Sequence, residues 1–218
     1  LTAQPLFNPE GGYATYVLPA AFVLLLQQML LMGVALLTTM AGIGFVATDA
    51  TAARPGPLAV IAGKLLAYLA LEALILPIYL LVLPYLYGLP RLGGVIPILI
   101  FAVPFVLAVA GLGLVVAGIF QNPLRVQLIL AAVGLPLFMA AGFSWPSEAI
   151  PPLIRWVSYL VPSTSAISGF IKLSQLGAPL SAVKPEFITL WFLALAYNFL
   201  AVMLVAAKPL TAFIENRP

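Results

Sequence analysis

The chain has 218 residues, of which 64% are hydrophobic and only 7% are charged, and its formal net charge is +3. Soluble domains carry about 25% charged residues, so this composition is that of an integral membrane protein. The basic residues are too scattered to form a nucleic-acid-binding patch, and the sequence has no His or Cys. This excludes Ser-His-Asp triads, thiol nucleophiles, disulfides and the usual zinc sites, and we predict neither catalytic residues nor a metal site.

The first 16 residues are polar, rich in Pro and Gly, and end in aromatic residues, which is typical of a loop that reaches a membrane interface. The chain begins Leu-Thr-Ala without an initiator Met, so we expect an incomplete protein. A first span is predicted at 17–46. Its Gln27-Gln28 pair is the only strongly polar interruption; these side chains either line a substrate path or, as the favoured interpretation, join helices through hydrogen bonds.

A polar loop is predicted at 47–64, because Pro55-Gly56-Pro57 breaks any continuous helix, although a short helix is allowed at 58–62. A second span at 65–87 contains Glu72. An ionisable residue inside a span is a candidate functional residue. Glu72 follows the end of the loop by only about 12 Å at 1.5 Å per residue, so a structural role near the interface is at least as well supported.

Three further spans are predicted, at 95–120, 126–143 and 187–207. The third span ends in GLGLVVAG, which resembles a dinucleotide-binding loop only superficially, since no strand or βαβ unit surrounds it. Gly113 and Ala117 are four residues apart and favour close helix packing instead.

The segment 134–178 is apolar but repeatedly interrupted, first by FSWPSEAIPP and again at Val161-Pro162-Ser163. It is too interrupted to cross a bilayer and too apolar for a soluble loop. Non-helical backbone at membrane depth needs cover from protein or a water-filled cavity. We therefore predict an all-α integral membrane protein with about five transmembrane helices and a re-entrant helical hairpin at 146–176 on the outer face.

Lys and Arg are denser in the loops 47–64 and 121–125 and in the tail 208–218 than in the loops on the opposite side. The positive-inside rule then places 47–64 in the cytoplasm and 1–16 outside. No P-loop motif occurs, so the chain is not expected to hydrolyse ATP itself.

Four stretches resemble the permease subunit of bacterial type 2 ABC exporters. They are FNPEGGYATYVLPAAFVLLLQQMLLMGVALL (7–37), Gly63-Lys64 at the start of a span, FQNPLRVQ (120–127), and LPLFMAAGFSWPSEAIPPLIRWVSYLVPSTSAISGFIKLSQLGAPLSAV (135–183). The last contains the family's Gly-Phe-x-x-Pro-x-x-x-(Ile/Met)-Pro turn, its Leu-x-Pro-Ser/Thr and its Gly-Ala. The chain corresponds to the C-terminal part of such a permease, in which 17–218 is the transmembrane domain and 1–16 ends a missing external domain.

The resemblance implies a multi-pass protein of the bacterial inner membrane, surrounded by lipid. Two permease copies, identical or paralogous, would form a substrate path between them, and separate ATP-binding-cassette subunits would supply ATP and Mg. Loop 47–64 would be the coupling loop that those subunits move. In this chain it reads TDATAARPGP, whereas the family often has Arg-Glu-x-x-Gly-Thr. The re-entrant pair would form part of the outer gate, and the cargo would be hydrophobic or amphipathic, such as a drug, lipid or glycan.

The candidate site residues fall into three groups. The candidate path residues are Gln27, Gln28 and Glu72. The candidate coupling residues are Asp49, Arg54, Pro55, Gly56 and Lys64. The candidate residues of the outer re-entrant gate are Phe143, Trp145, Pro146, Pro151 and Pro162. Two alternatives to an ATP-driven exporter remain open: an ion-coupled carrier or channel, which would depend on Glu72 and broken helices, and a membrane scaffold without transport.

Overall fold

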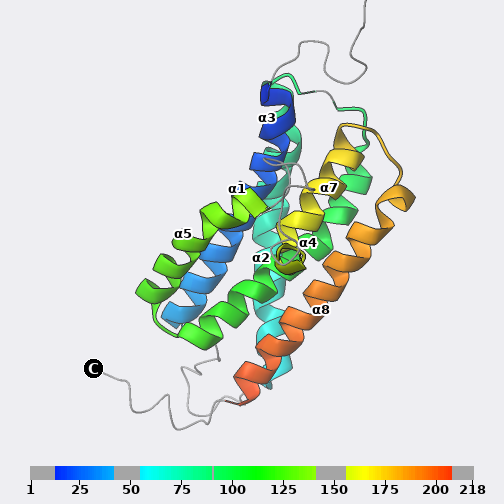
Figure 1. The fold of residues 1–218 in the computed structure, drawn as a ribbon. Coiled ribbons are helices and arrows are strands. Elements are labelled where there is room, and N and C mark those ends of the chain that lie inside the picture. Colours follow the sequence, from blue (N-terminus) through cyan, green and yellow to red (C-terminus); the bar gives the residue numbers. More distant parts are fainter. Residues whose placement is uncertain (1–12, 42–54, 90, 141–155, 208–218) are drawn as a thin grey trace, which may run out of the picture.

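The structure, a computed structural model, describes residues 13–41, 55–89, 91–140 and 156–207, and these are mostly helical with no strand among them (Figure 1). Its helices are α1 (Tyr13–Ala41), α2 (Pro57–Pro77), η1 (Ile78–Val82), α3 (Leu83–Leu86), α4 (Val95–Phe120), α5 (Pro123–Ala140), α7 (Pro162–Ser174), η3 (Leu180–Val183) and α8 (Lys184–Ala206).

Four helical segments within the described residues are long and apolar enough to cross a membrane: Val17–Ala41, Pro57–Leu86, Val95–Phe120 and Leu180–Ala206. The all-helical membrane fold is therefore confirmed, with four long spans. The fourth predicted span appears as the shorter apolar helix α5, and its last predicted residues, 141–143, lie outside the described ranges.

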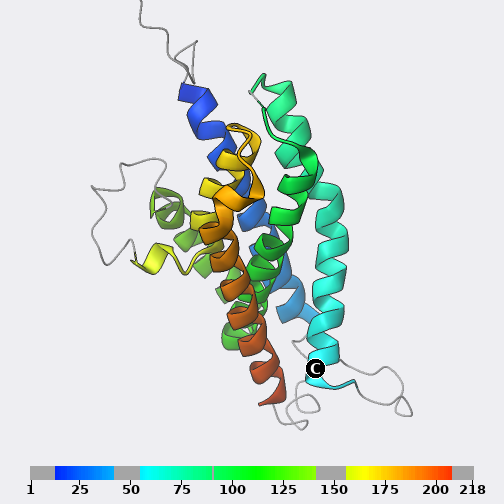
Figure 2. The ribbon, with the colours of Figure 1, turned by 90° about the vertical axis from the view of Figure 1, so that its right-hand side faces the viewer.

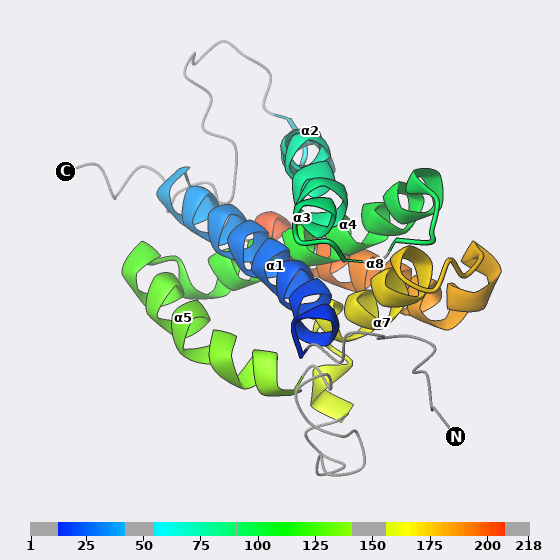
Figure 3. The ribbon, with the colours of Figure 1, turned by 90° about the horizontal axis from the view of Figure 1, so that it is seen from above.

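α4 occupies the middle of the bundle, in contact with α1, α2, α5, α7 and α8 (Figure 3). Glycines on two of its faces allow this close packing. A Cβ at Gly113 would lie 2.9 Å from Val34 of α1, and one at Gly111 would lie 2.8 Å from the Asn198 amide of α8. The packing interpretation of GLGLVVAG is thus supported by what these glycines contact.

The second span consists of α2, η1 and α3 in direct succession, and it contains a π-helical turn immediately after Pro77. Proline provides no N–H for the helical ladder and its ring crowds the preceding turn. A π-turn is one of the ways in which a helix accommodates such an interruption. The span therefore keeps its length while its hydrogen-bond pattern changes at mid-course.

The predicted boundary of the loop 47–64 is wrong at its C-terminal end. α2 begins at Pro57, with Gly56 at the N-cap in an extended conformation. Proline is favoured in the first helical turn, because its missing N–H would have no partner there and its φ is already helical. Lys64 therefore lies within α2. Glu72 is about 22 Å along the helix from Pro57, near the middle of the apolar segment Pro57–Leu86.

α7 is a short helix in the half of the bundle that also holds α3 and the start of α8 (Figures 1 and 2). The opposite half holds the end of α1, the start of α2, the α4–α5 turn and the end of α8. α7 contacts α1, α4 and α8, so it lies among the spans and not on their surface.

Candidate functional site

The first turn of α7 is enclosed by protein. Pro162, Ser163 and Ser165 are buried, and Ser163 has no exposed surface. Val161 precedes the helix in an extended conformation and forms no side-chain cap. The first N–H groups of a helix have no partner within it, so a helix that starts inside a bundle needs acceptors from elsewhere.

Gln27 of α1 supplies one such acceptor. Its Oε1 accepts a hydrogen bond of 2.6 Å from the backbone N–H of Ser163, and the Gln27 side chain is only 1% exposed. The adjacent Gln28 faces another helix, and its Nε2 donates to the Leu130 carbonyl of α5 at 3.0 Å. The pair thus joins α1 to two different helices, which supports the interhelical interpretation.

The C-terminal end of α7 is bound by the segment that leads into α4. The backbone N–H groups of Leu92 and Gly93 both donate to the Ser174 carbonyl, at 2.9 and 3.0 Å. Gly93 lies so close to α7 that a Cβ there would meet the Leu173 carbonyl oxygen. Both ends of α7 are therefore held through backbone groups that a membrane would otherwise leave unsatisfied.

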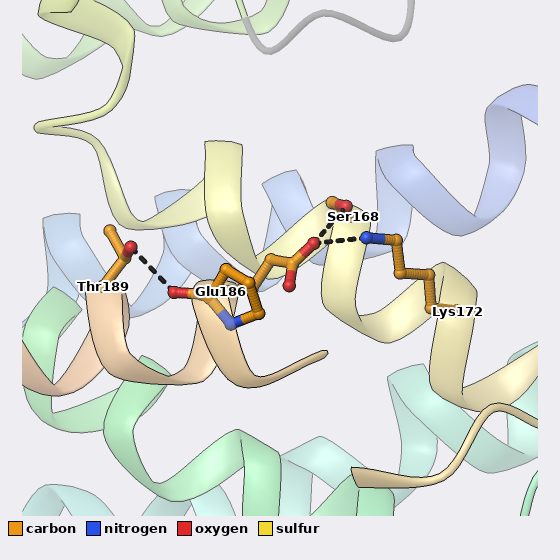
Figure 4. Close-up of polar contacts among 5 residues, drawn as sticks. Ser168, Lys172, Glu186 and Thr189 are labelled. Atoms are coloured by element: carbon orange, nitrogen blue, oxygen red, sulfur yellow. Dashed lines mark hydrogen bonds and ion pairs between the residues drawn. The ribbon is translucent and has the colours of Figure 1, made fainter. Parts of the chain in front are cut away.

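An ion pair links one flank of α7 to the start of α8. Glu186 Oε1 accepts from Lys172 Nζ at 2.5 Å and from Ser168 Oγ at 2.9 Å (Figure 4). Ser168 and Lys172 are four residues apart, so one helix face presents both donors. The second carboxylate oxygen of Glu186 is buried and has no partner among the described residues.

Aromatic rings pack the interface among α4, α7 and α8. Phe101 of α4 meets Phe170 of α7 edge-on at 5.1 Å between ring centroids, and it stacks on Phe187 of α8 at 6.0 Å. Phe105 also meets Phe170 edge-on, at 5.8 Å. Edge-to-face and offset-stacked pairs are the favoured aromatic arrangements. The buried Phe101 ring lies against Gly169, where α7 has no side chain.

The turn before α7 is tied to α8 as well. Tyr197 Oη donates to the Leu160 carbonyl, and Thr164 Oγ1 donates to the Ser158 carbonyl at 2.7 Å. A small apolar hollow lies on another side of α7, among α1, η1, α3 and α4, and its lining includes Phe22, Tyr79 and Phe170.

The predicted candidate residues do not gather at one place. Pro162 lies at the start of α7, and Gln27 of α1 contacts that start. Glu72 is elsewhere, on the buried face of α2 at 3% exposure. Pro55 and Gly56 directly precede α2, and both are exposed. Six candidates lie outside the described residues: Asp49, Arg54, Phe143, Trp145, Pro146 and Pro151. Within the described ranges no group of acidic side chains is placed to hold a metal ion.

Sequence reasoning missed four polar residues that join α7 or α4 to α8. Ser168, Lys172 and Glu186 form the flank contact, and their only signal was the four-residue spacing of the first two. Asn198 was also missed; its Nδ2 donates to the Leu107 carbonyl of α4 at 3.0 Å. A lone Asn inside an apolar span is the kind of residue that joins membrane helices.

Comparison with known proteins identifies relatives among transporters. Residues 1–203 match the family described as "ABC-2 family transporter protein". The "Probable multidrug ABC transporter permease YbhS" of Escherichia coli K12 is 30% identical over 106 residues, which cover 48% of this chain and 28% of YbhS. The "Inner membrane transport permease YhhJ" of the same strain is 28% identical over 117 residues, covering 53% of this chain and 31% of YhhJ. The match thus spans less than a third of either relative.

Proposed function

The chain belongs to the ABC-2 transporter family, and we propose that it is the transmembrane permease subunit of an ATP-driven exporter of the bacterial inner membrane. The family match over 1–203 carries this proposal. It is supported by four long apolar spans and by a short helix that starts among them, at the place where the sequence predicts a re-entrant segment.

Energy for transport comes from a separate ATP-binding subunit, since the chain has no P-loop motif. That subunit docks at the end of the bundle where α1 ends and α2 begins. The proposed coupling loop, 47–64, includes the first turns of α2, and Lys64 lies inside that helix. A rigid helix that begins so close to the docking segment passes a displacement directly to the second span.

A second copy of the permease, or a paralogue, completes the substrate path. The cargo is hydrophobic or amphipathic, in keeping with the multidrug description of YbhS. Only 7% of the residues are charged, so few fixed charges are available to line a path for small hydrophilic ions.

The test is co-purification of the full-length gene product with the ATP-binding subunit, followed by ATPase and transport measurements in proteoliposomes. Arg54→Ala and Lys64→Ala should weaken the complex or separate ATP hydrolysis from transport. Arg91→Ala is the matched control, because Arg91 is exposed and lies between α3 and α4, at the far end of the second span from the start of α2, so it should leave coupling unchanged.

An ion-coupled carrier is the competing function, and one observation favours it: Glu72 is a buried carboxyl group near the middle of a span. In that case no ATPase would associate, an ionophore would abolish transport, and Glu72→Gln would abolish it too. Transport that requires ATP and survives the ionophore would exclude this alternative.

A further inference from the structure

α1 and α7 are joined at a buried point by the hydrogen bond from the Ser163 backbone N–H to the Gln27 side chain. Neither the helix itself nor water offers this N–H another acceptor. The Ser163 N–H belongs to the first turn of α7 and has no acceptor within its own helix. It is fully enclosed, so water is not an alternative partner. Gln27 Oε1 therefore does what a capping side chain does for a soluble helix, but from another span.

The two ends of α7 are held by different parts of the molecule. The N-terminal end is bound by α1 through Gln27, whereas the C-terminal end is bound by the Leu92–Gly93 backbone ahead of α4. α1 (Tyr13–Ala41) precedes the proposed coupling loop 47–64 in the chain. Its displacement would reach the start of α7 through Gln27 and leave the other end anchored.

We propose that Gln27 is a positioning residue that sets the depth of α7 in the outer half of the bundle and makes the start of α7 follow α1. The first part concerns this chain alone. The second part, transmission from the ATP-binding subunit to α7, rests on the proposed export function.

The neighbouring groups show why the role belongs to Gln27. Gln28 is adjacent, but its bond goes to α5 and not to α7. Ser163 takes part through its backbone, and its Oγ is buried without a partner among the described residues. Gln28→Met and Ser163→Ala are therefore matched controls that leave the bond between Gln27 and α7 intact.

Cysteine accessibility tests the positioning role, because the natural chain has no Cys to interfere. Ser165→Cys is a nearly isosteric reporter in the first turn of α7, where Ser165 is buried. Ala102→Cys in α4, a buried position in the same half of the bundle as α7, reports general loosening there. The full-length protein in proteoliposomes is treated with a membrane-impermeant maleimide added from outside, and the labelling rate is measured.

Gln27→Met should raise labelling at position 165 about tenfold, as expected for local opening when a buried hydrogen bond is lost. Labelling at position 102 should stay unchanged. Gln27→Glu should keep the protected state, because an acceptor oxygen remains in either protonation state. The two control variants should label at the wild-type rate.

Three results would overturn the proposal: unchanged labelling at position 165 in Gln27→Met, an equal rise at position 102, or the same rise in Gln28→Met. The transmission part has its own readout. With the ATP-binding subunit present, ATP should alter labelling at position 165 in the wild type but not in Gln27→Met. If no ATPase associates, the export function fails while the labelling result without ATP still decides the positioning role.

Discussion

The ion pair between Lys172 and Glu186 should respond unequally to removal of its two members. The Glu186 side chain is 13% exposed and that of Lys172 is 41% exposed. Lys172→Met leaves an enclosed carboxylate with only the Ser168 hydroxyl as donor. Glu186→Met leaves an ammonium group that can turn toward water. The first change should therefore be the more destabilising one.

The depth at which Lys172 and Glu186 are buried determines how much stability is lost when their ion pair is broken. Breaking a fully buried pair costs about 3–5 kcal/mol, whereas an exposed pair contributes about 0–1 kcal/mol. With one enclosed and one partly exposed member, we expect Lys172→Met to lower the free energy of unfolding by about 2 kcal/mol and Glu186→Met by about 1 kcal/mol or less. Combining both changes removes the uncompensated charge, so the double variant should be close to Glu186→Met alone.

A double-mutant cycle on the full-length protein measures this coupling, with unfolding by SDS in mixed micelles followed by Trp fluorescence. Lys184→Met is the control, because Lys184 is exposed at the start of α8 and should change stability by less than about 0.5 kcal/mol. Equal effects of the two single changes, or a coupling energy near zero, would show that the contact does not hold α7 against α8.

Two further changes test the packing around α4. Gly169→Ala should destabilise the protein by about 1–3 kcal/mol in the same SDS titration, since the new methyl group meets the buried Phe101 ring. Gly33→Ala is the control: it has open space and should be neutral or slightly stabilising. Asn198→Leu removes the bond to the Leu107 carbonyl and should cost about 0.5–1.5 kcal/mol; a value near zero would mean that the Asn198 amide does not join α4 to α8.

The spans were predictable because apolar length is a local property. The third span, at 95–120, coincides with α4, and the last predicted span begins three residues after α8 does. The error at the start of α2 came from treating Pro55-Gly56-Pro57 as a single break. A proline can end one segment and begin the next, and only the backbone shows that Pro57 does the latter.

The polar contacts of α7 were not predictable in the same way. Gln27 and Ser163 are 136 positions apart, and the sequence around either residue does not predict a contact with the other. The sequence indicated that the Gln pair joins helices. It did not indicate that Gln27 accepts a hydrogen bond from the first turn of α7 or that Gln28 donates one to α5. Glu186 looked like an ordinary loop residue because its partners come from a helix that ends 12 positions earlier.

The burial of the three candidate path residues bears on where a path between two copies can run. Gln27 and Glu72 are enclosed within a single chain, at 1% and 3% exposure, whereas Gln28 is only partly buried. If the proposed path between two copies exists, a cargo would approach Gln28 only once its bond to α5 opens. It would reach Gln27 only if α7 withdrew, and Glu72 only if α2 turned or separated from its neighbours. Gln27 and Gln28 are neighbours on α1, so one movement of this helix would change both the contact with α7 and the contact with α5.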